Sequence, residues 1–365
     1  MMHKTIRVGI THGDINGIGY EVILKTFAEP MMLELCTPII YGSPKVAAYH
    51  RKTMDLQTNF SIIHDAEEAH PNKLSVLHCC DDELKVELGT ASSEVGKSAV
   101  VALDRAIADY QAGLIDVLVT APINKHVVQS ETFTFPGHTE YIQKKVGAGK
   151  KSLMILLNEE LRMALVTGHI PVSEVANTIT KDLIKEKLTI FHHSLKTDFG
   201  INNPRIAVFS LNPHAGDNGL LGKEEETIIL PAMEEMMTKG IQCFGPFPAD
   251  GFMGSGNYVH FDGVLAMYHD QGLAPFKALA MDEGVNFTAG LPIVRTSPAH
   301  GTAYDIAGKG IASESSFRQA VYTAIDIIRS RRNEARISAN PLRKLYHDKR
   351  DDSDKLKLDS IDDED

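Results

Sequence analysis

The sequence predicts an α/β fold with a largely parallel sheet, and three observations carry this prediction. Short runs rich in Val, Ile and Leu alternate with longer amphipathic stretches, a pattern typical of strands separated by helices. The chain has 365 residues, enough for two domains of ordinary size. Polar and glycine-rich segments directly follow several apolar runs, and ligands bind at such strand ends in open α/β sheets.

The apolar runs are expected to form buried strands because they are short and rich in branched side chains. They cover 5–10, 37–41, 116–120, 153–157, 163–167, 205–211 and 264–268. Two of the intervening segments carry apolar residues at helical spacing, namely Val100, Leu103, Ile107 and Tyr110 in the first and Phe317, Val321, Ile325 and Ile328 in the second. Strands separated by helices predict a sheet covered on both faces.

The charge balance argues against a protein that holds nucleic acid or anionic lipid through bulk charge, because the formal net charge is −11 and the pI is near 5.8. Residues 351–365 contain eight acidic side chains and two lysines, and such a tail is expected to be solvated and disordered. No apolar run approaches the roughly 20 residues of a membrane span. The cysteines have no paired spacing, which predicts buried thiols in a reducing cytoplasm: Cys36, Cys79, Cys80 and Cys243.

Five polar clusters follow predicted strands directly. Because the carboxyl ends of parallel strands meet at the same edge of a sheet, these clusters are expected to converge. In chain order they read THGDINGIG, TAPINK, TGHIP, NPHAGDNG and HDQG. Their convergence predicts an enzyme site.

Three of these clusters contain a histidine immediately after the strand, namely His169, His214 and His269. Neutral imidazoles suit Zn²⁺, Co²⁺, Ni²⁺ or Mn²⁺, and three of them leave coordination positions open for a substrate. Asp217 and Asp270 could hydrogen-bond to such ligands. A histidine in a loop more often makes only a hydrogen bond. Because the three histidines are also widely spaced in the sequence, their spacing alone does not decide whether they bind a metal.

Basic and polar side chains in an otherwise apolar, glycine-rich stretch indicate an anion site. Lys277, Asn286 and Arg295 occupy this stretch, where a basic residue either reaches solvent or faces a charged ligand. Arginine offers a bidentate fork and lysine a mobile charge, which together favour a small dianionic substrate. His138 and Thr139, in FPGHTEY, lie at the head of a predicted helix whose backbone N–H groups could hold an anion.

Two glycine-rich loops are candidates for nucleotide binding. The first, GDINGIG at 13–19, opens a predicted helix, and the second, HGTAYDIAGKGIA, follows at 300–312. The second lacks the strand–GxGxxG–helix context of a Rossmann loop, the first is ambiguous taken alone, and the sequence contains no GxxxxGK[ST] phosphate loop. Small residues allow close approach of a flat ring, but they are equally common in simple turns.

Eight motifs in chain order carry a specific resemblance: GITHGDINGIGYEV, TAPINK, FPGHTEYI, TGHIPVSEV, SLNPHAGDNGLLGKEE, GPFPADGFM, MYHDQGLAPFKAL and GVNFTAGLPIVRTSPAHGTAYDIAGKG. Together they resemble the 4-hydroxythreonine-4-phosphate dehydrogenase family of the vitamin B6 pathway, from about residue 5 to 330. The two glycine-rich loops also resemble loops of isocitrate and isopropylmalate dehydrogenases.

The resemblance implies an isopropylmalate-dehydrogenase-like fold, with two α/β/α domains and an active-site cleft between them. We assign 1–130 and 296–345 to a discontinuous first domain, 131–295 to the second, and 346–365 to the acidic tail. The resemblance also implies a homodimer in which the metal site draws on both subunits.

Carried over by motif, the resemblance implies one divalent metal (Zn, Mg, Co or Mn) bound by His169, His214 and His269. It implies five substrate-binding residues, namely His138, Thr139, Lys277, Asn286 and Arg295. The implied cofactor is NAD or NADP, and the candidate positions for it are Gly13, Gly17, Gly301, Thr302, Ala303 and Asp305.

The implied reaction is oxidation of 4-phosphooxy-L-threonine to 2-amino-3-oxo-4-phosphooxybutanoate. This product loses CO₂ to give 3-amino-2-oxopropyl phosphate, a step toward pyridoxal 5'-phosphate. A general base must take the hydroxyl proton, and Asp250 and Asp270 are the candidates, although either carboxylate could be structural.

The first loop departs from the family pattern, because it reads GDINGIGYE, with Tyr20, where the family usually has GEPAGIGPE. This departure leaves the choice between NAD and NADP open. Lys309, which lies in the loop that could select the 2'-phosphate of NADP, also leaves it open. Three other functions stay open: a dehydrogenase of threonate or erythronate phosphate, a phosphate acetyltransferase, and a non-catalytic metal- or metabolite-binding protein.

Overall fold

The computed structural model describes residues 5–129, 135 and 137–340, and their strands join in one sheet. The strands are β1 (Ile6–Thr11), β2 (Cys36–Gly42), β3 (Ser61–Ile63), β4 (Ser75–His78), β5 (Val117–Thr120), β6 (Leu153–Leu157), β7 (Arg162–Leu165), β8 (Arg205–Phe209), β9 (Gln242–Phe247), β10 (Gly263–Ala266), β11 (Val285–Ala289) and β12 (Arg295–Pro298). Their order across the sheet is β3-β4-β2-β1-β5-β12-β11-β6-β7-β10-β8-β9.

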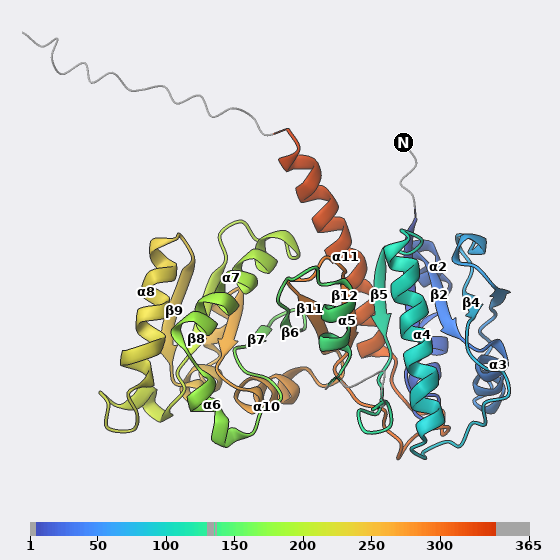
Figure 1. The fold of residues 1–365 in the computed structure, drawn as a ribbon, viewed down its shortest axis with the longest axis horizontal. Coiled ribbons are helices and arrows are strands. Elements are labelled where there is room, and N and C mark those ends of the chain that lie inside the picture. Colours follow the sequence, from blue (N-terminus) through green and yellow to red (C-terminus); the bar gives the residue numbers. More distant parts are fainter. Residues whose placement is uncertain (1–4, 130–134, 136, 341–365) are drawn as a thin grey trace, which may run out of the picture.

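The helices flank this sheet along its length (Figure 1). They are α1 (Gly19–Thr26), α2 (Pro30–Leu35), α3 (Pro44–Thr53), α4 (Ser93–Gln111), α5 (His138–Val146), α6 (Val172–Thr178), α7 (Lys181–Thr197), α8 (Leu230–Thr238), α9 (Ala249–Gly254), α10 (His269–Ala280) and α11 (Ser315–Ser338). Both segments with helical spacing are confirmed as helices, within α4 and α11.

The seven predicted strands all form, and the α/β class is confirmed. The sheet is parallel toward both ends, but its centre is not. β6 pairs antiparallel with β7 and with β11, and β11 pairs antiparallel with β12. β6 and β7 are antiparallel because the link between them, 158–161, is too short for the crossover that parallel strands need.

The core lies on both faces of the sheet. Along β2, Ile40 packs into one apolar cluster, whereas Ile39 and Tyr41 pack into another. Alternate residues of one strand are thus buried on opposite sides, as in sheets covered by helices on both faces. Helix α11 packs on the central strands β5, β11 and β12, and its C-terminal half projects beyond the sheet (Figure 1).

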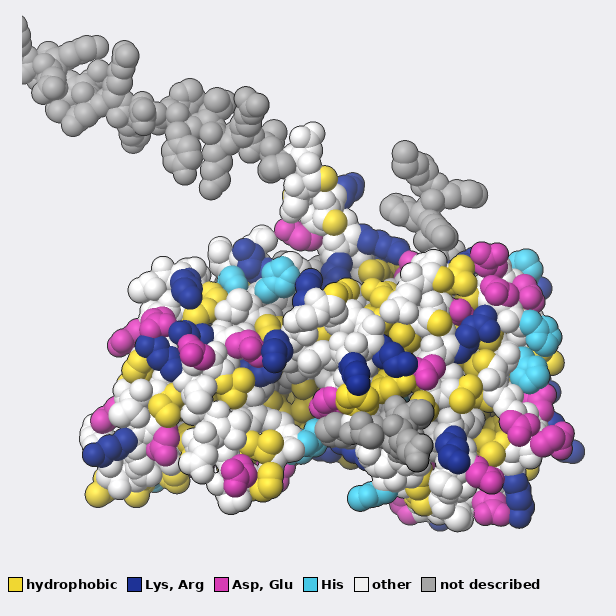
Figure 2. All heavy atoms as spheres, viewed as in Figure 1, with side chains coloured by type: hydrophobic (Ala, Val, Ile, Leu, Met, Phe, Trp, Pro, Cys, Tyr) yellow, Lys and Arg dark blue, Asp and Glu magenta, His cyan; other side chains and the backbone are white. Residues whose placement is uncertain are grey.

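Acidic and basic side chains are interspersed over the face seen in Figure 2, and the surface is hollowed between the two halves of the molecule. None of the helices in the described part of the chain is long and apolar enough to cross a membrane. All four cysteines are free thiols; Cys36, Cys80 and Cys243 are buried, and Cys79 is half-buried.

The division into two domains stays a prediction. Its boundary at 295/296 falls at the start of β12, in the middle of the continuous sheet. The predicted acidic tail at 346–365 lies outside the described residues.

Candidate active site

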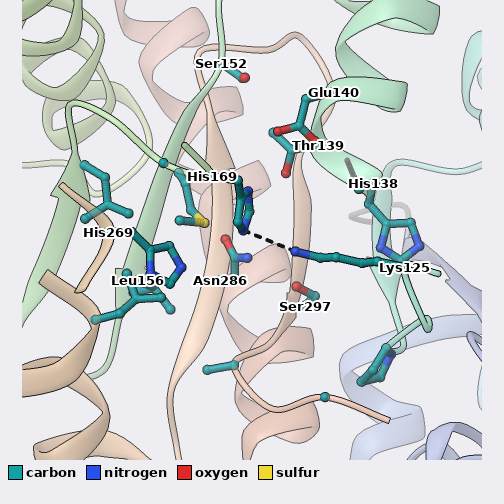
Figure 3. Close-up of a pocket in the computed structure, with 18 of the residues that line it drawn as sticks. Lys125, His138, Thr139, Glu140, Ser152, Leu156, His169, His269, Asn286 and Ser297 are labelled. Atoms are coloured by element: carbon teal, nitrogen blue, oxygen red, sulfur yellow. Dashed lines mark hydrogen bonds between the residues drawn. The ribbon is translucent and has the colours of Figure 1, made fainter. Parts of the chain in front are cut away.

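A pocket of about 580 Å³ lies beside the central strands, and its lining comes from segments far apart in the chain (Figure 3). This volume is in the range of small-molecule sites. The pocket brings together eight of the residues predicted from the sequence, namely His138, Thr139, His169, His269, Lys277, Asn286, Arg295 and Gly301. Of the five strand-end clusters expected to converge, TAPINK, TGHIP and HDQG contribute to the described lining, whereas THGDINGIG and NPHAGDNG do not.

Arg295 is the most deeply buried charge in the pocket, with 3% of its surface exposed. Its guanidinium donates to Thr120 Oγ1 at 2.6 and 3.1 Å and to Thr288 Oγ1 at 3.3 Å. Burial lowers the pKa of Arg295 to about 10, and the charge of Glu140 opposes that shift. The side chain is therefore cationic at neutral pH, and its hydrogen-bond partners among the described residues carry no negative charge.

His138 begins α5 and lies 3.2 Å, through Nδ1, from Arg295 Nη2. A guanidinium can only donate, so Nδ1 accepts and the ring proton is on Nε2. Burial, with the charges of Arg295 and Lys125, holds the pKa of His138 well below its usual value. His138 is thus a neutral imidazole with one N–H to offer a ligand.

Asn286, on β11, has a buried Oδ1 with no hydrogen-bond partner among the described residues. Buried polar atoms are almost always paired, so this acceptor is available to a group that enters the pocket. Thr139 Oγ1 lies 3.5 Å from Thr288 Oγ1, and Lys277 reaches the lining from the last turn of α10.

His169 and His269 face each other across part of the pocket, with ring centroids 5.4 Å apart. His269 Nδ1 donates to Asp270 Oδ1 at 2.6 Å, so in the neutral ring the lone pair is on Nε2. Lys125 Nζ donates to His169 Nε2 at 3.1 Å, so this nitrogen also has its lone pair (Figure 3). Burial and the charge of Lys125 lower the pKa of His169. In their neutral forms both rings carry an unprotonated Nε2 of the kind a divalent metal requires, and at His169 a metal would take the place of the Lys125 N–H.

His214 is not part of this pocket lining. It follows β8, whereas His169 and His269 follow β7 and β10, and these three parallel strands are adjacent in the sheet. Nevertheless, residues 5–129, 135 and 137–340 contain no group of three metal-binding side chains close enough to hold an ion. The three-histidine site therefore stays a prediction.

The two candidate bases occupy different environments. Asp270 is exposed and orients His269 through the hydrogen bond described above. Asp250 is exposed in the first turn of α9 and is absent from the described lining of the pocket. Within this single chain, Asp270 is the carboxylate next to a candidate ligand.

The two glycine-rich loops pack against each other. Ile18 N donates to Thr302 O at 3.1 Å, and a Cβ at Gly17 would lie 2.6 Å from that same oxygen. Gly13 has φ +71° and lies against the backbone at Pro122. Thr302, Ala303 and the exposed Asp305 belong to the second loop, so the predicted cofactor residues share one region.

Sequence reasoning missed three residues of this region. Lys125 ends the quoted motif TAPINK, and its place directly after a predicted strand was the available signal. Tyr304 donates to Asp14 Oδ2 at 2.5 Å and accepts from Asn124 Nδ2 at 3.2 Å, which ties three loops together. Burial raises the pKa of Asp14. No sequence signal paired Tyr304 with Asp14, because 290 residues separate them.

Comparisons with known proteins show which family the chain belongs to. The family model described as pyridoxal phosphate biosynthetic protein PdxA matches residues 34–324. A 4-hydroxythreonine-4-phosphate dehydrogenase of Bacteroides thetaiotaomicron is 70% identical over 364 residues and is covered completely, as is this chain. A relative of the same name from Sulfurihydrogenibium is 40% identical over 327 residues, covering 90% of this chain and all of the relative.

A solved structure is similar over nearly the same length. The crystal structure of 4-hydroxythreonine-4-phosphate dehydrogenase from Klebsiella pneumoniae has a TM-score of 0.78 at 32% identity, and the match covers 90% of this chain and 99% of that one. The fold expected from the resemblance is thereby confirmed. With the family model spanning most of the described chain, the protein belongs to the PdxA family and is an oxidoreductase.

Proposed function

We propose that this protein oxidises 4-phosphooxy-L-threonine with NAD⁺ or NADP⁺ and a divalent metal, in pyridoxal 5'-phosphate biosynthesis. The product, 2-amino-3-oxo-4-phosphooxybutanoate, is a β-keto acid that loses CO₂ to give 3-amino-2-oxopropyl phosphate. The single observation that carries the proposal is the buried Arg295, a cation in the pocket whose described partners are two hydroxyls and an imidazole.

The charge of the pocket suits a substrate with phosphate and carboxylate groups. The described lining contains Lys125, Lys187, Lys277 and Arg295 against one carboxylate, that of Glu140. A buried guanidinium without an anionic partner is costly, and a bound phosphate or carboxylate offsets that cost with charge-assisted hydrogen bonds. The N–H of His138 Nε2 and the hydroxyl of Thr139 supply further donors beside it.

Asn286 supplies the complementary group. Its orphan Oδ1 can accept a hydrogen bond from the substrate ammonium or hydroxyl. Donors for the anion and an acceptor for the polar backbone of the substrate therefore lie in one pocket, which supports binding in a fixed orientation.

A divalent metal held by His169, His269 and His214 would lower the pKa of the substrate hydroxyl and polarise the carbonyl that replaces it. Asp270 keeps His269 in the tautomer with Nε2 unprotonated. Lys125 lies beside His169, where its charge favours a bound anion. We keep Asp270 and Asp250 as candidates for the base, with Asp250 depending on a second subunit.

The paired loops around Gly17 and Thr302 are the proposed place for the nucleotide part of the nicotinamide cofactor, which would supply the hydride acceptor. Tyr304, Asp14 and Asn124 fix the relative positions of these loops and the TAPINK loop. The proposed homodimer, with a metal site drawn from both subunits, explains why His214 is absent from the pocket of one chain. We place the enzyme in the cytoplasm.

A substrate panel tests the proposal. Reduction of NAD⁺ or NADP⁺ is measured with 4-phosphooxy-L-threonine and with the 4-phosphates of threonate and erythronate, in which a hydroxyl replaces the amine. We expect the amino substrate to give the highest kcat/KM. Higher kcat/KM with a hydroxy acid phosphate would contradict the substrate assignment and leave the reaction class intact.

A further inference from the structure

The segment that carries His214 has an uncommon backbone. Six consecutive residues have positive φ, and four of them are not glycine: His214 (52°), Ala215 (53°), Gly216 (82°), Asp217 (45°), Asn218 (53°) and Gly219 (84°). Residues with side chains rarely adopt this left-handed conformation, and they keep it only when surrounding contacts enforce it. We call residues 214–219 the left-handed turn. Something outside the turn must therefore hold it.

The carboxylate of Glu225 hydrogen-bonds to the residues directly before the turn. Glu225 is 2% exposed, and its Oε1 accepts from the backbone N–H groups of Leu211 and Asn212, each at 2.8 Å. Its Oε2 accepts from Asn212 Nδ2 at 2.9 Å. These three bonds fix the chain where it leaves β8, directly before the turn.

The turn also packs onto this carboxylate. A Cβ at Gly216 would lie 2.8 Å from Glu225 Oε2, and one at Gly222 would lie 2.2 Å from Asn212 Nδ2. Gly216 and Gly222 therefore allow contacts that a larger residue would block. Glu225 also begins a π-helical turn, Glu225–Ile229, and such turns are frequent at functional sites.

The side chain of His214 remains exposed while its backbone is held. A buried anion with three N–H donors thus fixes a strained segment that presents one imidazole to the surface. Backbone strain of this kind is typical of a segment that holds a functional side chain in one orientation.

We propose that Glu225 is a positioning residue that holds His214 in the orientation required for metal binding. This inference rests on the proposed function only in taking His214 as a ligand. It does not depend on which subunit supplies His169 and His269.

Glu225→Gln is the direct test, because it preserves shape while its NH₂ would face the NH₂ of Asn212. In the metal-free protein, we expect the amides of Leu211 and Asn212 to exchange with solvent about tenfold faster. With Co²⁺ alone as the probe, followed by its visible absorption, we expect the Kd to rise about 10- to 100-fold. Glu226→Gln removes the same charge from the exposed neighbouring residue and is expected to change neither quantity.

His214→Ala separates the two proposals. We expect it to raise the Kd for Co²⁺, and Glu225→Gln added to it should raise the Kd no further. If His214→Ala lowers the affinity for Co²⁺ and Glu225→Gln does not, the positioning role of Glu225 is wrong. An equal loss from Glu225→Gln with and without His214 also contradicts it. If His214→Ala leaves the Kd unchanged, the ligand assignment fails, and the positioning role falls with it.

Asn212→Ala provides a second variant in case Glu225→Gln does not fold. It removes the Nδ2 contact and leaves the buried carboxylate with both backbone donors. We expect the Kd for Co²⁺ to rise about tenfold. An unchanged Kd in a folded Asn212→Ala protein would contradict the positioning role.

Discussion

At the scale of single residues, the pocket depends on charged and polar groups that are buried without ionic partners. Arg295 and Asn286 were both predictable from the sequence, because a basic and an amide side chain interrupt an apolar, glycine-rich stretch. Their environment was not predictable. The hydroxyls of Thr120 and Thr288 and the imidazole of His138 come from distant segments, so the tautomer of His138 follows only from the fold.

Arg295→Lys tests the anion site. Lysine keeps the charge but loses the planar fork that bonds to Thr120 and Thr288, so we expect kcat/KM to fall on the order of 100-fold, mainly through KM. Steady-state kinetics with the amino substrate give this value. Arg329→Lys, on the exposed part of α11, is the matched control and should behave as wild type. An unchanged KM in Arg295→Lys would exclude Arg295 from substrate binding.

A second residue-scale prediction concerns stability against pH. His50 is buried, and its Nε2 bonds to Ile15 O at 2.8 Å; burial lowers its pKa from 6.5 to about 4. Between these values the unfolded chain binds a proton that the folded chain does not, so His50 lowers stability as pH falls from about 6.5 to 4. The full effect is on the order of 3 kcal/mol.

His50→Gln removes this titration while keeping a side-chain N–H for Ile15 O. We expect the loss of unfolding free energy between about pH 7 and pH 5 to become smaller, as measured by urea unfolding at both values. His260→Gln, at an exposed position, is the control. The same loss in wild type and His50→Gln would show that His50 does not set this dependence.

At the scale of elements, apolar runs predicted the strands that are buried and rich in branched side chains. Five further strands in the described residues were not predicted. Among these, β11 and β12 lie in the middle of the sheet and carry Asn286 and Arg295. Polar residues within the strands hide the apolar pattern, and they are there because they face the pocket. The antiparallel pairs β6/β7 and β11/β12 likewise follow from short links between their strands, which hydrophobic periodicity does not report.

The contact between the two glycine-rich loops leads to a prediction about the cofactor. Gly17→Ala places a Cβ 2.6 Å from Thr302 O, which forces the loops apart. We expect the KM for the nicotinamide cofactor to rise about tenfold, with a smaller change in the KM for the phosphorylated substrate. Gly254→Ala, at a helix position with open space around it, is the control. Equal changes in both KM values would argue against this location for the cofactor.

At the scale of the whole molecule, motif order was enough to predict the fold and the family, and both are confirmed. The position of His214 was not predictable in this way. Its strand is adjacent to those of His169 and His269, but it begins the left-handed turn, and among the described residues it does not join them in a three-ligand group. Spacing in the sequence carries no information about such a turn or about a second subunit.

Mixing two inactive variants tests whether the site is shared between subunits. His169→Ala and His214→Ala are each expected to be inactive. If each site combines His169 of one subunit with His214 of the other, random exchange between equal amounts restores about a quarter of the wild-type rate. A mixture that exchanges subunits but stays inactive would place His169 and His214 of each site in the same chain.

Metal dependence of hydride transfer tests the central claim most directly. The absorbance of reduced nicotinamide is followed with 4-phosphooxy-L-threonine before chelator treatment, after it, and after addition of Zn²⁺, Mg²⁺, Co²⁺ or Mn²⁺. We predict that chelation abolishes the reaction and that at least one of these ions restores it in the wild type but not in His269→Ala. Full activity of the folded protein after verified metal removal would contradict the account.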